Sequence, residues 1–245
     1  MKRKMIAAMI FTILAAFLVT GCGNKGKDLL LKYAFEEGLE GWKGDFTDLP
    51  VDLEEDIYEL FFGYAELPKE LEMNRKALMI SSSNRSDDIF MYIRKQLTEA
   101  DGIKPNTVYK VVFTVEFATN APAGAFGIGG PPGEAVFFKV GASATEPLPV
   151  KTGLDSDYPY YELSVDKGSQ NDEGDAAILI GNVAKDDGSD DFNYALKKLD
   201  NKDRPIEVTS DENGNIWLFI GTDSGFEGTT SLYYTNIEVI LEKAE

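Results

Sequence analysis

The chain has 245 residues, with 24 Lys and Arg against 42 Asp and Glu, a formal net charge of −18 and no histidine. A chain this acidic repels phosphate, so we expect neither nucleic-acid binding nor docking of the folded body on anionic lipid. Without histidine there can be no Ser-His-Asp or Cys-His catalytic site, and none of the usual His-ligated zinc sites.

Residues 1–21 are predicted to be an export signal. Three basic residues after Met1 precede the apolar run "MIAAMIFTILAAFLVT", which falls short of the ~20 residues of a membrane-spanning helix. The run ends at Val19-Thr20-Gly21-Cys22, which resembles the lipobox of bacterial lipoproteins. An ordinary signal peptide with an incidental cysteine is the alternative.

The lipobox resemblance implies a location. In lipoproteins the cysteine is lipidated and becomes the first residue after cleavage, which makes Cys22, the only cysteine, a lipid anchor bearing palmitate or similar acyl chains. We therefore expect the chain on the extracytoplasmic side of a bacterial membrane. Gly23 follows the cysteine where inner-membrane retention uses Asp, which favours the outer membrane where one exists. Residues 22–28 are small and polar and are predicted to be a tether.

Residues 29–245 are predicted to form a single all-β domain. Runs typical of strands occur, in chain order, at 29–36, 58–67, 88–97, 109–117, 135–143, 160–165, 176–183, 206–210, 215–221 and 231–242. In the fourth run Tyr109, Val111 and Phe113 share one face, as expected of a half-buried strand. Short helices are possible at 67–78 and 193–202.

About ten strands with few short helices indicate antiparallel sheets. We expect a two-sheet β-sandwich of the jelly-roll kind, with a closed barrel as the alternative. Residues 141–215 are the least regular part, and we expect long acidic loops between short strands there.

Three segments carry a further resemblance. "FEEGLEGWKGDF", "TVYKVVFTVEFAT" and "YYTNIEVILE" are similar to the first, middle and last strands of galactose-binding-like, carbohydrate-binding jelly rolls. The last strand of that family often has an Asp-Asn pair where this chain has Thr235-Asn236. The whole chain is also similar to uncharacterised bacterial lipoproteins that carry "NRSDD" and "GIGG" stretches. The first resemblance implies a sugar ligand.

Sugar binding needs flat aromatic faces and polar groups that can pair with hydroxyls. The candidates that combine these properties with a position in or near loops are Trp42, Asn84, Arg85, Asp87, Tyr158, Tyr160 and Tyr161. The alternatives are that Trp42 closes one end of the sandwich and that the 84–88 stretch is a turn in which Arg85 pairs with an aspartate.

Two acidic loops are candidates for a structural calcium ion, because Ca²⁺ prefers six to eight oxygen ligands. "DKGSQNDEGD" and "KDDGSDD" supply the candidate ligands Asp172, Asp175, Asp186, Asp187 and Asp190. Neither loop fits the EF-hand spacing. The alternative is that these acids only keep the protein soluble. No other cofactor is expected.

The remaining catalytic options are a carboxylate pair, Ser-Lys chemistry and a metal held by oxygen ligands. For a carboxylate pair of the glycosidase kind, Glu116 and Glu134 are the candidates. The glycine-rich stretch at 124–133 fails the phosphate-binding patterns and is read as a tight connection between strands. We therefore expect a binding protein rather than an enzyme. A structural or adhesion protein that contacts another envelope protein is the main alternative, and a glycoside hydrolase or lyase is a further one.

Overall fold

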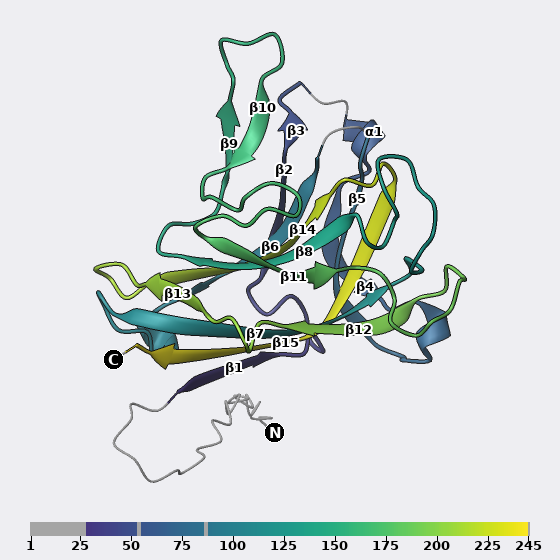
Figure 1. Ribbon diagram of the computed structural model, residues 1–245. Helices are drawn as coiled ribbons and strands as arrows, with labels where there is room; N and C mark the ends of the chain where they lie inside the picture. Colours follow the sequence, from purple (N-terminus) through teal and green to yellow (C-terminus); the bar gives the residue numbers. More distant parts are fainter. Residues whose placement is uncertain (1–27, 53–54, 86–87, 245) are drawn as a thin grey trace, which may run out of the picture.

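The computed structural model describes residues 28–52, 55–85 and 88–244 and shows an antiparallel β-sandwich (Figure 1). The first sheet has the strand order β12 (Ala195–Asp200), β7 (Val108–Thr119), β15 (Thr229–Lys243), β5 (Lys76–Ser83) and β4 (Phe61–Glu66). In addition, β1 (Leu29–Tyr33) pairs with β15, and β13 (Ile206–Thr209) pairs with β7. The predicted all-β sandwich is confirmed.

The second sheet packs face to face with the first. Its order is β11 (Ala177–Asn182), β8 (Val136–Ser143), β14 (Ile216–Ser224), β6 (Phe90–Leu97) and β2 (Lys43–Thr47). Alternation along β14 sends Leu218 and Ile220 into the space between the sheets, while Phe219 and Asp223 face the opposite way. The main core therefore lies between the two sheets.

A small third sheet stands above the second at the top of Figure 1. It consists of β3 (Leu49–Pro50), β10 (Tyr160–Leu163) and β9 (Pro149–Thr152), in that order. The helical elements of the described residues are short: α1 (Glu55–Tyr58) and two 3₁₀ turns at Lys69–Leu71 and Glu99–Asp101. None of the helices in this part of the chain is long and apolar enough to cross a membrane.

The structure corrects three details of the predicted elements. The described residues form fifteen strands rather than about ten. Residues 193–202 contain strand β12 instead of a helix, because Leu196 to Asp200 pair with Ala118 to Thr114 of β7. The 67–78 segment holds only a single 3₁₀ turn before β5 begins. The signal peptide, Cys22 and most of the tether lie outside the described residues and stay predictions.

Candidate functional site

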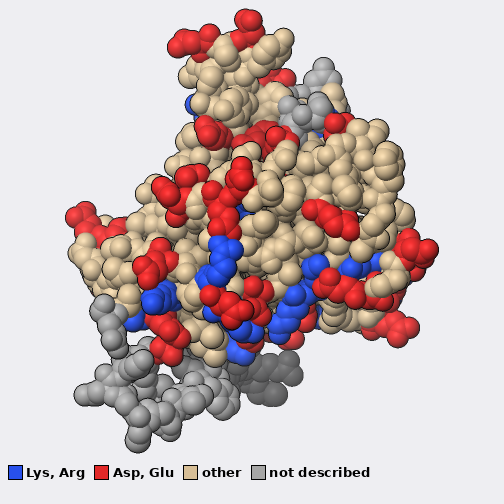
Figure 2. Space-filling model, viewed as in Figure 1, with Lys and Arg blue, Asp and Glu red and all other residues tan. Residues whose placement is uncertain are grey.

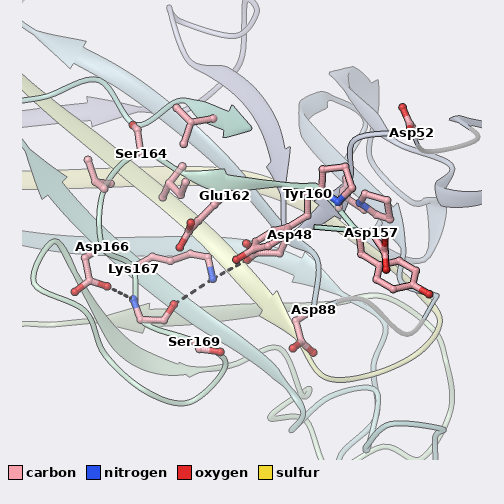
Figure 3. A pocket seen from close by; sticks show the side chains of 18 residues that line it. Asp48, Asp52, Asp88, Asp157, Tyr160, Glu162, Ser164, Asp166, Lys167 and Ser169 are labelled. Carbon is pink, nitrogen blue, oxygen red and sulfur yellow. Dashed lines mark hydrogen bonds and ion pairs between the residues drawn. The ribbon is translucent and has the colours of Figure 1, made fainter. Parts of the chain in front are cut away.

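A cleft of about 1070 Å³ opens between the small third sheet and the chain segment that follows β10. Figure 3 shows Lys167 reaching towards Asp48 with Glu162 beside them, while Asp52 and Asp166 lie further out. Its lining residues are Asp48, Leu49, Pro50, Asp52, Asp88, Val150, Asp157, Tyr158, Pro159, Tyr160, Glu162, Leu163, Ser164, Val165, Asp166, Lys167, Gly168 and Ser169. A concave site of this size can hold a ligand as large as several linked sugar rings.

The β9–β10 hairpin provides the aromatic wall of the cleft. Tyr160 pairs with Thr152, and Glu162 pairs with Val150, so alternation places Tyr160 and Glu162 on the cleft side. Tyr158, at the turn before β10, is 86% exposed, and Tyr160 is 42% exposed. Both rings therefore have a face available to a ligand.

The opposite wall is formed where residues 163–176 fold back over the outer face of the second sheet. Leu163 packs there with Phe90, Tyr92, Ala177 and Phe219 in a second apolar cluster, separate from the main core. Phe90 and Tyr92 stack with their ring centroids 5.3 Å apart. This cluster covers part of the outer sheet face and confines the cleft to its edge.

A chain of buried charges forms the floor. The Lys167 ammonium lies 2.8 Å from Asp48 Oδ2 and 2.8 Å from Asp223 Oδ2, and the Lys139 ammonium lies 3.2 Å from the same Asp223 oxygen. Lys167 also lies 4.9 Å from the centre of the Phe90 ring. Two lysines and two aspartates thus neutralise one another beneath the cleft.

Burial perturbs these groups. Desolvation raises the pKa of Asp48 to about 6, although the Lys167 charge acts in the opposite direction. Desolvation lowers the pKa of Lys139, partly offset by Asp223. Desolvation also acts to lower the pKa of Lys167, but the charges of Asp223 and Asp48 outweigh it, and the net shift is upward.

The cleft is strongly acidic. Among the described residues, its lining contains one cationic side chain, Lys167, and the carboxylates of Asp48, Asp52, Asp88, Asp157, Glu162 and Asp166. Figure 2 shows acidic side chains on the third sheet and around it, while the basic side chains visible on this face gather lower down. The field at the cleft favours hydroxyl donors and cations and opposes anions.

The structure separates the predicted sugar-binding residues. Tyr158 and Tyr160 line the cleft. Tyr161 is not among the lining residues, because alternation turns it to the other face of β10, where Lys151 lies 5.8 Å from its ring centre. Asp87 lies outside the described residues.

The other predicted sugar contacts do not reach the cleft. Trp42 is 2% exposed and packs edge-on against Tyr33 in the main core, which corrects its interpretation as a ligand platform. Asn84 is buried, and its Nδ2 donates to the backbone oxygens of Ser224 and Phe226. Arg85 is exposed and donates to the backbone oxygen of Ile57.

The first acidic loop is organised by backbone and lysine groups. Asp166 accepts hydrogen bonds from the backbone N–H groups of Gly168 and Asp175. The backbone oxygen of Asp172 accepts from Lys139 Nζ at 3.0 Å. The loop that contains the predicted ligands Asp172 and Asp175 is therefore held together by hydrogen bonds from backbone N–H groups and from Lys139.

The second acidic loop folds around the buried ammonium of Lys185. Lys185 Nζ lies 2.8 Å from Asp191 and 3.9 Å from Asp187, and Asp186 instead pairs with Lys197. Among the described residues, no group of three or more acidic side chains lies close enough together to hold a metal ion. Calcium binding by Asp172, Asp175, Asp186, Asp187 or Asp190 stays a prediction.

The candidate catalytic carboxylates have separate structural partners. Glu116 Oε1 accepts a hydrogen bond from the Thr235 hydroxyl, and Glu134 Oε1 accepts one from the backbone N–H of Gly124. Neither lines the cleft. In the glycine-rich connection, Gly129 has a φ of 72°, and an added Cβ would lie 2.2 Å from the Gly225 oxygen.

Sequence reasoning missed the acidic residues of the cleft. Asp48, Glu162 and Lys167 meet there from three different segments. Asp48 has a φ of 60°, which a sequence pattern does not mark. The alternation of "YPYYEL" was the one available signal, since it predicts that Tyr160 and Glu162 share a face.

Comparison with known proteins gives only distant likenesses. No family model matches the chain, and no curated protein matches it. Among solved structures it is similar to the K1 cleaved adhesin domain of Lys-gingipain from Porphyromonas gingivalis W83 (TM-score 0.36, 13% identity, covering 88% of this chain and 99% of that one). It is also similar to the CBM22-1-CBM22-2 tandem domain of Paenibacillus barcinonensis Xyn10C (TM-score 0.39, 14% identity, 92% of this chain and 49% of that one).

A third likeness is to a cyclase from Fischerella sp. TAU, with a TM-score of 0.38 and 13% identity, covering 88% of this chain and 99% of the cyclase. These proteins have unlike functions. At such TM-scores and identities the likenesses carry no argument about what this chain binds. The residues of the cleft are therefore the evidence for its function.

Proposed function

We propose that the cleft binds a neutral or amine-bearing carbohydrate and that the chain is a binding protein. The observation that carries this proposal is the pairing of two exposed tyrosines, Tyr158 and Tyr160, with carboxylates in one cleft. Tyrosine rings offer apolar faces to sugar rings. Carboxylates such as Glu162 and Asp157 accept hydrogen bonds from sugar hydroxyls.

The charge of the cleft narrows the ligand class. The described lining residues include six carboxylates and one lysine that is itself paired with two aspartates, and this charge opposes acidic polysaccharides such as uronates or sulfated glycans. An amino sugar gains from the same carboxylates and from cation–π contact with the tyrosines. We therefore expect uncharged and amine-bearing glycans to bind more tightly than anionic ones of similar length.

A glycan array followed by titration calorimetry tests the proposal. We expect Tyr158→Ala and Tyr160→Ala each to weaken binding about fivefold, because each removes a stacking face contributing ~1 kcal/mol. Tyr161→Ala is the matched control on the same strand and should leave the affinity unchanged, since Tyr161 does not line the cleft. Binding that is indifferent to Tyr158 and Tyr160, or an array without binders, would contradict the proposal.

A second candidate function is contact with another envelope protein. It rests on the glycine-rich connection, in which Phe126 is 95% exposed and Ile128 is also largely exposed. Contiguous exposed apolar surface marks interaction sites, and Phe126 and Ile128 lie two residues apart in the same connection. If this function holds, the double variant Phe126→Ser, Ile128→Ser should lose a partner that co-purifies with the unmodified chain, while glycan binding persists.

We further propose that the chain is lipid-anchored through Cys22 on the extracytoplasmic side of a bacterial envelope, in the outer membrane where one exists. The support is the lipobox-like sequence at residues 19–22. Labelled palmitate should be incorporated into the unmodified chain and not into Cys22→Ala. Equal labelling of both chains would contradict the anchor.

A further inference from the structure

Beneath the cleft, Lys139 and Asp223 lie together on the outer face of the second sheet. Lys139 pairs with Gly221 on the neighbouring strand β14, two residues before Asp223. Both side chains are 0% exposed, and Lys139 Nζ lies 3.2 Å from Asp223 Oδ2. The apolar cluster that includes Phe90 and Phe219 lies on the same sheet face. The pair is thus held on two adjacent strands and shielded from water.

The two carboxylate oxygens of Asp223 have very different surroundings. Oδ2 accepts from three donors: Lys139 Nζ, Lys167 Nζ at 2.8 Å and the backbone N–H of Gln170 at 3.0 Å. Oδ1 is buried and has no hydrogen-bond partner in the described part of the chain. Leaving one oxygen of a buried carboxylate bare is costly. Loss of Oδ1 from the carboxyl group removes this cost.

We propose that Lys139 and Asp223 condense to form an intramolecular isopeptide bond. A bond forms between Lys139 Nζ and Asp223 Cγ, and the bond between Cγ and Oδ1 breaks. Two of the three ammonium protons leave with Oδ1 as one molecule of water, and the third stays on the amide nitrogen. The reaction balances without an oxidant, a reductant or any co-reactant, and it removes one buried positive and one buried negative charge.

The surrounding groups suit each part of this reaction. Burial lowers the pKa of Lys139, which favours the neutral amine that acts as nucleophile. Proton transfer from Lys139 Nζ to Asp223 produces this amine together with a neutral carboxylic acid, and the transferred proton ends on Oδ1, the oxygen that leaves. The packed strands hold the amine beside the acid, which removes most of the entropic cost of the encounter.

Negative charge that develops on Oδ2 during attack is met by the Lys167 ammonium and the Gln170 N–H. Lys167 keeps its charge through its 2.8 Å contact with Asp48. Lys167 and the Gln170 N–H hold Oδ2 in place, whereas Oδ1 has no partner among the described residues, so Oδ1 is the leaving oxygen. Asp48 is therefore a positioning residue for Lys167.

Mass spectrometry of the purified Cys22→Ala chain, with its N-terminus read from the same spectra, tests the inference. We expect an intact mass below the sequence mass by one water molecule. Protease digestion should give one branched peptide that joins the segments around residues 139 and 223. An intact mass equal to the sequence mass would overturn the inference, and so would a branch at Lys167.

Variants separate the roles of the three residues. Asp223→Ala and Lys139→Met should each show their full sequence mass, whereas Lys167→Met should form the bond slowly and incompletely. Asp45→Ala is the matched control, because it removes an aspartate from another ion pair on this sheet face, that with Arg94, and should leave the water loss complete. Full water loss in Lys139→Met would overturn the pairing, and full loss in Lys167→Met would overturn the role of Lys167.

Discussion

Asp48 is the residue at which burial and charge compete most clearly. Its side chain is mostly buried and has Lys167, Asp223 and Glu162 as charged neighbours. Because its pKa is raised to about 6 in the folded chain, above its ordinary value, the folded state binds a proton at this site more tightly than the unfolded state does. Ionisation of Asp48 therefore opposes folding at neutral pH.

The contribution of Asp48 to the stability of the fold therefore depends on pH. As pH rises from about 4 to about 6, the Asp48 contribution to stability falls, and it returns as pH falls again. Asp48→Asn lacks this titration. We expect the difference in unfolding free energy, unmodified minus variant, to be larger at pH 4 than at pH 7 by on the order of 2 kcal/mol. Urea titrations at both values measure it, and a pH-independent difference would contradict the prediction.

Trp42 shows why a residue type alone does not identify a ligand platform. Its ring is buried against Tyr33, so removing it opens a cavity in the main core. We expect Trp42→Ala to lower the free energy of unfolding by about 3–5 kcal/mol. Trp42→Phe should lower it less, and the fraction of either variant that is folded should keep the glycan affinity of the unmodified chain. Guanidinium titration and calorimetry measure both quantities.

At the scale of elements, the 141–215 region determines the character of the site. The hairpin β9–β10 and residues 163–176 cover the outer face of the second sheet and form the cleft at its edge. Gly141 of β8 permits this packing. A Cβ there would lie 2.1 Å from the Phe219 ring and 2.6 Å from the Ala176 oxygen.

We therefore expect Gly141→Ala to destabilise the chain by about 1–3 kcal/mol through overpacking of the second apolar cluster. Thermal unfolding followed by circular dichroism measures the change. Gly188→Ala is the control: its positive φ carries some backbone strain, but nothing lies within 4 Å of the added Cβ. A larger loss for Gly188→Ala than for Gly141→Ala would contradict the packing argument.

Strands were predictable where apolar and polar residues alternate clearly along the sequence. The 109–117 and 231–242 runs lie within β7 and β15, because their apolar faces point into one core. The "NYALKKLDNK" segment was expected to allow a short helix, since the spacing of its few apolar residues also fits a helix. It forms strand β12 instead, because it pairs with β7. The floor of the cleft was not predictable, because Lys139, Lys167 and Asp223 meet only through tertiary packing.

At the scale of the whole molecule, β1 and the third sheet lie at opposite ends of the described body. The described chain enters through β1 at the bottom of Figure 1, and the third sheet stands at the top. The cleft is lined by residues of this third sheet. Residues 22–28 reach at most about 25 Å when extended. If Cys22 is anchored, we expect the cleft to face away from the membrane, where a large glycan can approach.

Accessibility to a bulky, water-soluble maleimide reagent tests this orientation without knowledge of the ligand. Cys22 is the only natural cysteine, and lipidation would consume its thiol. Tyr158→Cys then places a thiol at the cleft, and Leu30→Cys places one on β1, where the side chain is 52% exposed. We expect the cleft thiol to react equally fast on vesicle-bound lipidated chain and on detergent-solubilised chain. The β1 thiol should react severalfold more slowly on vesicles, because the bilayer shields the end of the body that carries the tether. The reverse pattern, or shielding of both thiols, would contradict an outward-facing cleft.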